Sequence, residues 1–297
     1  MMNSFFFSVV IPTYNRELLI VRAVDSVLAQ QFTDFEVWVV DDGSTDNTEK
    51  IIRSIKDSRL QYIKIKNSER GAARNTGIKL SRGRYVTFLD SDDYFYPSHL
   101  AFVYKQLAQK NHPEFYHQGY VVMNARERIL QKSYPIGDLG KALFARGNLM
   151  SCAGVFVSRI ILLENLFNES RILAGLEDWE LWIRLVSIFP LHYDPTVTSV
   201  LVQHDDRSSM QVQRNKLENK GRLFIELVSS NPHVKATYGP LIPKLVANVY
   251  SYLSLHLSDT HGEKAVARQF LFRAIKKDRG QIFKKRTLVI LRNLLFT

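Results

Sequence analysis

Apolar residues recur along the first part of the chain with two different spacings. Short runs of β-branched and aromatic residues predict buried strands, and apolar residues three or four apart predict amphipathic helices. The predicted strands cover residues 7–11, 35–40, 60–65 and 84–89. Predicted helices lie between them, at residues 20–28, after Asp46 and at about 72–80. This alternation predicts an α/β fold with a mostly parallel sheet flanked by helices on both faces.

Local signals predict where several of these elements begin or end. Pro12 should stop the first strand, and Pro97 should lie in the first turn of a helix. Asp46 and Glu49 have the spacing of a capping box. We expect Asp93 to cap the helix that follows it.

A polar loop follows each of the four predicted strands. The loops read PTYNR at 12–16, DDGS at 41–44, NSERGAAR at 67–74 and DSDD at 90–93. Ligands of such sheets bind outside the carboxyl ends of the strands, so these loops should converge on one edge.

The acidic loops suggest what could bind at that edge. Neither a G-x-G-x-x-G after the first strand nor a G-x-x-x-x-G-K-[ST] is present, so a phosphate ligand needs another counter-charge. A divalent cation held by carboxylates could screen a diphosphate from Asp42, Asp90 and Asp92. The alternative is that Asp and Ser only form turns, but four coordinated loops favour a nucleotide site.

The later part of the chain adds further elements. Residues 115–123 and 149–157 are predicted strands. GLEDWELW at 175–182 begins a predicted helix that has Leu181, Leu185 and Ile188 on one face. Carboxylates at a helix start are favoured by the dipole, so Glu177 and Asp178 could be functional or could only cap the helix. Helical spacing returns at 217–228 and 241–257, which predicts a helical appendage after about residue 211.

Charge and cysteine content limit the class of protein. The net charge of +11 is carried by residues 211–297, which hold 16 basic and 5 acidic residues. Binding to nucleic acid would explain the basic tail. It would not explain residues 1–210, which are neutral overall and have acidic loops, so no nucleic-acid partner is expected. Cys152 is the single cysteine, so an internal disulfide is excluded and a reducing compartment is expected. We expect Cys152 to be a small core residue.

Membrane contact is predicted only at the end of the chain. No segment approaches the ~20 apolar residues of a membrane span, and the opening residues lack the features of a signal peptide. We therefore expect a cytoplasmic protein, soluble or peripheral on the inner face of the membrane. Residues 281–296 combine bulky apolar residues with four cations, which is typical of a segment drawn to anionic lipid. The alternative is packing on the domain or self-association with another copy.

Four motifs resemble the family 2 glycosyltransferases. They are SVVIPTYNR at 8–16, VWVVDDGSTDNT at 37–48, GAARNTGI at 71–78 and GRYVTFLDSDD at 83–93, and their order matches that family across roughly residues 5–210. The resemblance implies a GT-A fold, with a catalytic domain at 1–210 and a basic helical region at 211–297. It also implies an inverting hexosyltransferase that uses a nucleotide sugar, most often a UDP-sugar, with Mn²⁺ or Mg²⁺. The acceptor would be a hydroxyl of a glycan or lipid-linked molecule, as in bacterial surface polysaccharide synthesis.

The resemblance also implies roles for individual residues at the donor site. Pro12 and Tyr14 would flank the base, and Asp42 would hold the uracil. The remaining donor-site residues would be Asn67, Arg74, Asp90 at the ribose, and Ser91. Tyr14 could instead be a packing aromatic, and Arg74 a solvated charge.

Metal and base positions follow from the same resemblance. Asp92 would ligate the metal, and His204 would lie against the metal or diphosphate, unless it is a structural histidine. Asp178 matches the base in the E-D-x-x-L pattern, and Glu177 would contact the acceptor or cap the helix. The alternative for the whole chain is a catalytically silent relative that only binds a nucleotide or partner. Such a relative would lack the metal Asp or the base, and both are present here.

Overall fold

The computed structural model describes residues 5–203, 214–260 and 262–296, which fall in two compact units. The first unit contains residues up to 137 together with 150–181 and 189–205, and the second contains 138–149, 182–188 and the residues from 206 onward. The junction between 210 and 211 lies outside the described residues. The division into domains 1–210 and 211–297 therefore stays a prediction.

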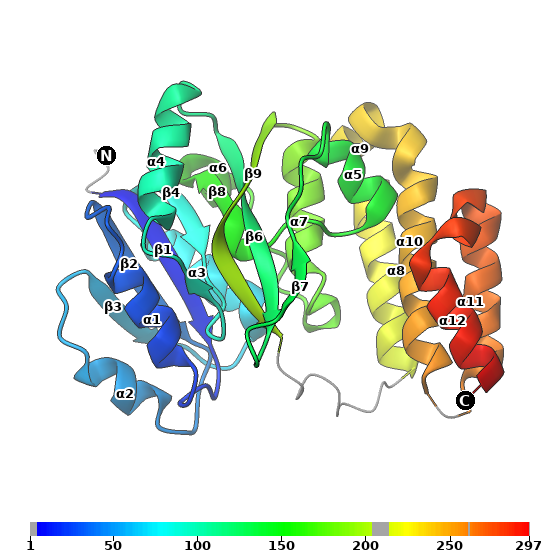
Figure 1. The fold of residues 1–297 in the computed structure, drawn as a ribbon, viewed down its shortest axis with the longest axis horizontal. Helices are drawn as coiled ribbons and strands as arrows, with labels where there is room; N and C mark the ends of the chain where they lie inside the picture. The colour runs from blue at the N-terminus through cyan, green and yellow to red at the C-terminus, as the bar shows by residue number, and fades with distance from the viewer. Residues whose placement is uncertain (1–4, 204–213, 261, 297) are drawn as a thin grey trace. The chain divides into compact units, whose positions relative to one another are not determined.

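The first unit is built on one nine-stranded sheet (Figure 1). Its strands are β1 (Phe5–Thr13), β2 (Phe35–Asp41), β3 (Leu60–Lys64), β4 (Gly83–Phe88), β5 (Tyr94–Phe95), β6 (Phe115–Asn124), β7 (Ile129–Lys132), β8 (Val155–Ser158) and β9 (Leu191–Gln203). They lie in the order β3-β2-β1-β4-β8-β6-β9-β5, with β7 paired to β6. The first four strands are parallel to one another, whereas β8 is antiparallel to both β4 and β6. The predicted parallel sheet is confirmed for that half, and the other half is mixed.

Both faces of the central strand β1 are buried, which is why helices cover the sheet on two sides. Phe7, Val9 and Ile11 pack in one core with buried residues of α1 (Ile20–Leu28) and α4 (His99–Gln109). Val10 points to the other face, where it meets Gly77 of α3 (Glu69–Leu80). The remaining helical elements of this unit are α2 (Thr48–Ser54), α6 (Arg159–Glu164), the start of α7 (Glu177–Val186), and the 3-10 turns η1 (Cys152–Gly154) and η2 (Arg171–Leu173).

Pro12 does not end the first strand, contrary to the prediction. It pairs in register with Val40, and Thr13 pairs with Asp41. Strand β4 follows β1 only as far as Val10. The side of Pro12 that lacks an N–H therefore has no strand to bond, and a proline is tolerated there.

Two other local predictions were partly wrong. Only Val155–Ser158 of the predicted strand 149–157 is extended, because the Ser151 hydroxyl accepts the Ala153 amide and starts a 3-10 turn. Asp46 does accept the amide of Thr48 at the start of α2. Glu49 does not complete a capping box, since its carboxylate pairs with Arg53 and Lys64.

The second unit is helical. Its helices are α5 (Leu139–Arg146), α8 (Arg214–Ser230), α9 (Pro232–Tyr238), α10 (Ile242–Ser258), α11 (Lys264–Lys277) and α12 (Lys285–Phe296), with short turns η4 (Gly239–Leu241) and η5 (Arg279–Phe283). The predicted helices at 217–228 and 241–257 are confirmed by α8 and α10. Across the described ranges, none of the helices has the length and apolarity needed to cross a membrane.

A buried polar cluster holds three elements of this unit together. Asn248 of α10 donates to the carbonyl of Phe144 at 2.7 Å and accepts the Lys284 ammonium at 2.6 Å. Lys284 also donates to the carbonyl of Ala145, and Arg286 donates to the carbonyl of Asn248. Two of the four cations in 281–296, Lys284 and Arg286, thus bond within the unit.

The close packing of α3 on β1 gives a first prediction. A Cβ atom at Gly77 would lie 2.3 Å from Cγ1 of the buried Val10. We expect Gly77→Ala to lower the free energy of unfolding by about 1–3 kcal/mol through overpacking, measured by urea denaturation. Gly137→Ala is the matched control, because no atom lies within 4 Å of its added methyl. Equal denaturation midpoints for the two variants would contradict this packing.

Candidate active site

The loops after β1 and β2 are bonded to each other. The amide of Asn15 donates to the Ser44 hydroxyl at 2.9 Å, and the amide of Thr45 donates to Oδ1 of Asn15 at 2.8 Å. Gly43 has a φ of +84°, and a Cβ there would meet the amide nitrogen of Asn67 at 3.0 Å. The first three predicted loops therefore meet at the carboxyl edge of the sheet.

Asp42 joins the second loop to the third. Its carboxylate accepts the amides of Ser68 at 2.6 Å and Glu69 at 2.9 Å, and the side-chain amide of Asn67 at 3.2 Å. Burial raises the pKa of Asp42, while the two backbone amides oppose the rise. Each carboxylate oxygen can accept more than one bond, so the expected contact of Asp42 with uracil stays a prediction.

The two residues expected to flank the base lie at the end of β1. Tyr14 is 48% exposed, and Pro12 is buried in the strand. The exposed ring of Tyr14 is available to a ligand, which disfavours the alternative of a packing aromatic. Their contacts with a base stay predictions.

Arg171 is a site residue that the sequence reasoning missed. It forms an ion pair with Glu69 at 3.2 Å and donates to Oδ1 of Asn67 at 2.9 Å, as well as to the Asn67 carbonyl. Glu69 has a φ of +75°, so this arginine braces a strained turn. Arg171 belongs to no local motif and lies 104 residues from Asn67. The sequence gives no signal for this contact.

Arg74 lies inside the protein, between two carboxylates. It is 1% exposed, and it donates to Oε1 of Glu177 at 2.9 Å and to Oδ1 of Asp90 at 2.7 Å. Its guanidinium also lies 5.4 Å from the centre of the Phe167 ring. This burial excludes the alternative that Arg74 is a solvated charge. The residue connects α3, the acidic loop and the start of α7.

The residues of the acidic loop at 90–93 have different partners. Asp90 pairs with Arg74, and Ser91 is buried. Asp93 accepts the amide of Val202 in β9 at 2.8 Å, and the N-cap of α4 is Ser98, so the expectation that Asp93 caps this helix was wrong. Arg22 donates to the backbone carbonyl of Asp92, and the Asp92 carboxylate makes no hydrogen bond or ion pair to a described residue. His204 lies outside the described residues.

The Asp92 carboxylate is the best candidate for a metal ligand. Within the described parts of the chain, no cluster of three or more His, Cys, Asp or Glu side chains could enclose an ion. Mg²⁺-type sites commonly use one or two carboxylates, with the substrate phosphates and water filling the other positions. One uncommitted carboxylate in a strand-end loop, two residues from the partly exposed Asp90, fits that donor set.

Asp178 occupies the first turn of α7, next to the buried Glu177. Burial, followed by the neighbouring charge of Glu177, raises the pKa of Asp178 to about 7, and Arg74 opposes the rise. Glu177 itself accepts the amide of Gly175 and pairs with Arg74. Glu177 is therefore committed to the structure, while Asp178 has the pKa expected of a general base near neutral pH.

The comparisons with known proteins show the family of the chain. Residues 8–160 match the model of the family described as glycosyl transferase family 2. The chain belongs to this family.

Individual relatives extend the comparison. A UDP-Glc:alpha-D-GlcNAc-diphosphoundecaprenol beta-1,3-glucosyltransferase, WfaP of Escherichia coli, is 47% identical over 90 residues, which is 30% of this chain and 36% of that protein. S. aureus TarS 1-349 in complex with UDP-GlcNAc superposes with a TM-score of 0.63 at 18% identity, covering 95% of this chain and 92% of that one. PcManGT, a mannosyltransferase from Pyrobaculum calidifontis in complex with GDP-Man and Mn²⁺, gives a TM-score of 0.61 at 17% identity, covering 97% and 84%. The fold is thus that of GT-A glycosyltransferases, as predicted. The chain spans about a third or less of the length of the curated relatives that it matches first.

The buried ion pairs of Arg74 give a second prediction. Arg74→Met should lower the free energy of unfolding by about 3–5 kcal/mol, because the buried Glu177 would lose its close partner and keep only the exposed Arg70, at 3.8 Å. Arg53→Met, which breaks an exposed pair with Glu49, should cost at most about 1 kcal/mol. Chemical denaturation of both variants tests this, and similar losses would show that the Arg74 pairs add nothing beyond a surface contact.

The raised pKa of Asp178 gives a third prediction. A folded-state pKa of about 7 against an ordinary value of 3.8 means that stability is lost as pH rises through this window. Asp178→Asn removes that loss, so it should raise the free energy of unfolding at pH 8 by about 1–4 kcal/mol and have little effect at pH 4. Thermal unfolding at both pH values, with the exposed Asp34→Asn as control, measures it. An effect independent of pH would contradict the assigned pKa.

Proposed function

We propose that the chain is an inverting glycosyltransferase that transfers a sugar from a UDP-sugar to a hydroxyl of a glycan or lipid-linked acceptor. The observation that carries this proposal is the ion-pair network through Arg74, which joins the acidic loop to the residue beside Asp178. Family membership supports sugar transfer. TarS in complex with UDP-GlcNAc and the UDP-Glc-dependent WfaP support a uridine nucleotide. The diphosphoundecaprenol substrate in the name of WfaP supports a lipid-linked acceptor in bacterial surface polysaccharide synthesis.

The donor nucleotide would lie against the loops at the carboxyl edge of the sheet. The exposed Tyr14 ring offers a stacking surface for the base next to Pro12, and Asp42 and Asn67 supply polar contacts from the next loops. Asp90 would bond the ribose, with Ser91 beside it. Arg74 serves this site through Asp90, because its guanidinium donates to that carboxylate and fixes its direction.

A bound Mn²⁺ or Mg²⁺ would neutralise the diphosphate that leaves with the nucleotide. Asp92 would hold the ion, since its carboxylate makes no hydrogen bond to a described residue. The Mn²⁺ complex of PcManGT supports the use of a divalent metal. A contribution from His204 stays a prediction, because that residue lies outside the described part.

Asp178 would act as the base. The acceptor oxygen attacks the anomeric carbon as the bond to the diphosphate breaks, and its proton passes to the Asp178 carboxylate. A single displacement of this kind inverts the configuration at the anomeric carbon. Burial sets the pKa of Asp178 to about 7, so the group can accept a proton in the transition state and release it to water afterwards. The ion pair of Glu177 with Arg74 fixes the start of the helix that carries Asp178.

We also propose that the protein acts in the cytoplasm, at the inner face of the membrane where a lipid-linked acceptor would be presented. The alternative of a catalytically silent relative finds no support in the site. Asp92 and Asp178, the residues proposed as the metal ligand and the base, are both present.

The fourth prediction tests this function. Thermal-shift screening of nucleotide sugars with Mn²⁺ should identify a donor by its rise in Tm. With that donor, Asp178→Asn should lower kcat about 10²–10⁴-fold and leave donor binding unchanged. Asp92→Asn should instead weaken donor binding in the presence of Mn²⁺. The kcat of the unmodified protein should increase with pH through about 7, because the ionised carboxylate of Asp178 is required.

Asp34→Asn is the control for both variants, because its side chain is exposed. If Asp178→Asn turns over the donor at the normal rate, Asp178 is not the base. If no nucleotide sugar shifts the Tm or is consumed, the proposed transfer reaction is wrong.

A further inference from the structure

Helices α11 and α12 expose large apolar side chains on one side. Phe272 is 69% exposed, Leu288 63% and Leu295 72%, and Leu291 is also exposed. Residues 288, 291 and 295 share one face of α12, because helical neighbours lie three or four residues apart. This is a continuous stripe rather than scattered single residues.

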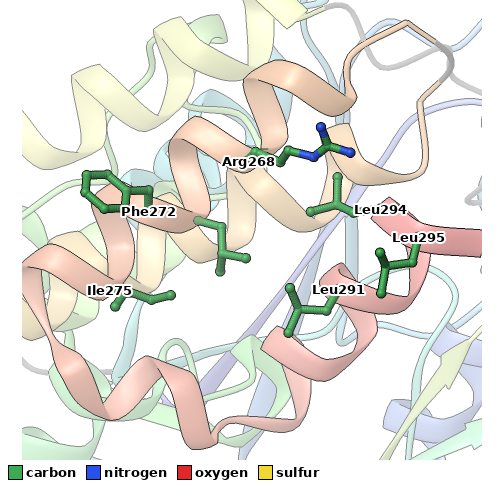
Figure 2. Close-up of a pocket in the computed structure, with 7 residues that line it drawn as sticks. Arg268, Phe272, Ile275, Leu291, Leu294 and Leu295 are labelled. Atoms are coloured by element: carbon green, nitrogen blue, oxygen red, sulfur yellow. The ribbon is translucent and has the colours of Figure 1, made fainter.

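A groove of about 350 Å³ lies between the two helices (Figure 2). Its lining is almost entirely apolar and consists of Arg268, Leu271, Phe272, Ile275, Leu291, Leu294 and Leu295. Figure 2 shows these side chains along the space between α11 and α12. The exposed stripe and the groove thus form one surface, which we call the α11–α12 face.

Cations surround the apolar residues of this face. Arg268 and Lys276 lie four residues before and after Phe272, and Lys285 and Arg292 lie three before and four after Leu288. All four cations are exposed. The two helices together hold eight Lys or Arg residues and no Asp or Glu. The face is therefore apolar in the middle and positively charged at its margin.

Packing within the unit accounts for the opposite side of α12 only. Ile290 is buried, and Lys284 and Arg286 bond into the Asn248 cluster. These contacts anchor the start of α12 and leave the stripe at 288, 291 and 295 in solvent. One side of α12 therefore packs on its own unit, as the alternative reading expected, whereas the stripe at 288, 291 and 295 does not.

We propose that the α11–α12 face docks on the surface of a bilayer that contains anionic lipid. Phe and Leu side chains of such a face enter the boundary between headgroups and acyl chains, while the Lys and Arg margin pairs with the headgroups. The protein would lie on the membrane through this face. The surface contains none of the residues assigned to the transfer reaction, and the inference does not rest on that reaction.

The charge distribution favours anionic lipid over a second copy of the chain. Residues 211–297 carry 16 basic and only 5 acidic residues. Two copies that met through this face would bring like charges together, which opposes association. An anionic bilayer supplies the opposite charge, and each cation near its surface contributes about a fivefold gain in partitioning.

The fifth prediction is tested by vesicle flotation of the full chain. Vesicles of phosphatidylcholine alone are compared with vesicles that also contain phosphatidylglycerol. The full chain should float with the anionic vesicles only, and binding should weaken as salt is raised. Absence of binding to the anionic vesicles would overturn the proposal.

Three variants locate the surface. The charge variant is Arg268→Gln, Lys276→Gln, Lys285→Gln and Arg292→Gln. The matched control removes four exposed cations of the first unit and is Lys50→Gln, Lys79→Gln, Lys105→Gln and Lys110→Gln. The apolar variant is Phe272→Ser with Leu295→Ser. The charge variant should lose about fivefold in partitioning per cation, the apolar variant at least about tenfold, and the control much less.

Equal losses in the charge variant and its control would overturn the assignment of the surface. Sedimentation velocity tests the alternative that a second copy of the chain covers this face. If the full chain forms a dimer that Phe272→Ser dissociates, and does not float with anionic vesicles, a second copy covers the face and the proposal is wrong. All substituted side chains are exposed, and circular dichroism verifies that each variant is folded.

Discussion

The positive charge of Arg74 lies in the interior, where water cannot solvate it. A charge in that position is tolerated only when opposite charges and hydrogen bonds compensate it. The two carboxylates that do so are Asp90, in the loop after β4, and Glu177, at the start of α7, which lie 16 and 103 residues away in the sequence. Asp178 follows Glu177 directly in the chain. The requirement to neutralise one guanidinium therefore fixes the position of the candidate base relative to the loop that would hold the donor.

The same network sets the acidity of the candidate base. The negative charge of Glu177 raises the pKa of Asp178, and the positive charge of Arg74 lowers it. With burial added, the balance lies near neutral pH rather than at either extreme. On the surface Asp178 would be fully ionised at neutral pH, whereas here it can still bind a proton. This lowers the stability of the folded state, as is common at functional sites.

Sequence patterns predicted the parts of this structure that depend on local spacing. The first four strands and the loops that carry Asp42, Asp90 and Asp92 follow from apolar runs that end in polar residues, and the structure places them close to the predicted positions. The bonds of Arg74 to Glu177 and of Arg171 to Asn67 could not be predicted, because each joins segments about a hundred residues apart. The inward direction of Lys284 was equally hidden, since it depends on Asn248 in another helix.

The position of Glu177 also bears on how the chain acquires its structure. The part that matches the family, residues 8–160, contains Arg74 and Asp90 but ends before Glu177. Closing a contact over 103 residues costs chain entropy before it brings any gain, and topologies rich in such contacts fold slowly. A nascent chain that has emerged only as far as residue 160 would hold an arginine with half of its counter-charge. The segment that identifies the family is thus shorter than the segment that must be synthesised before its site can close.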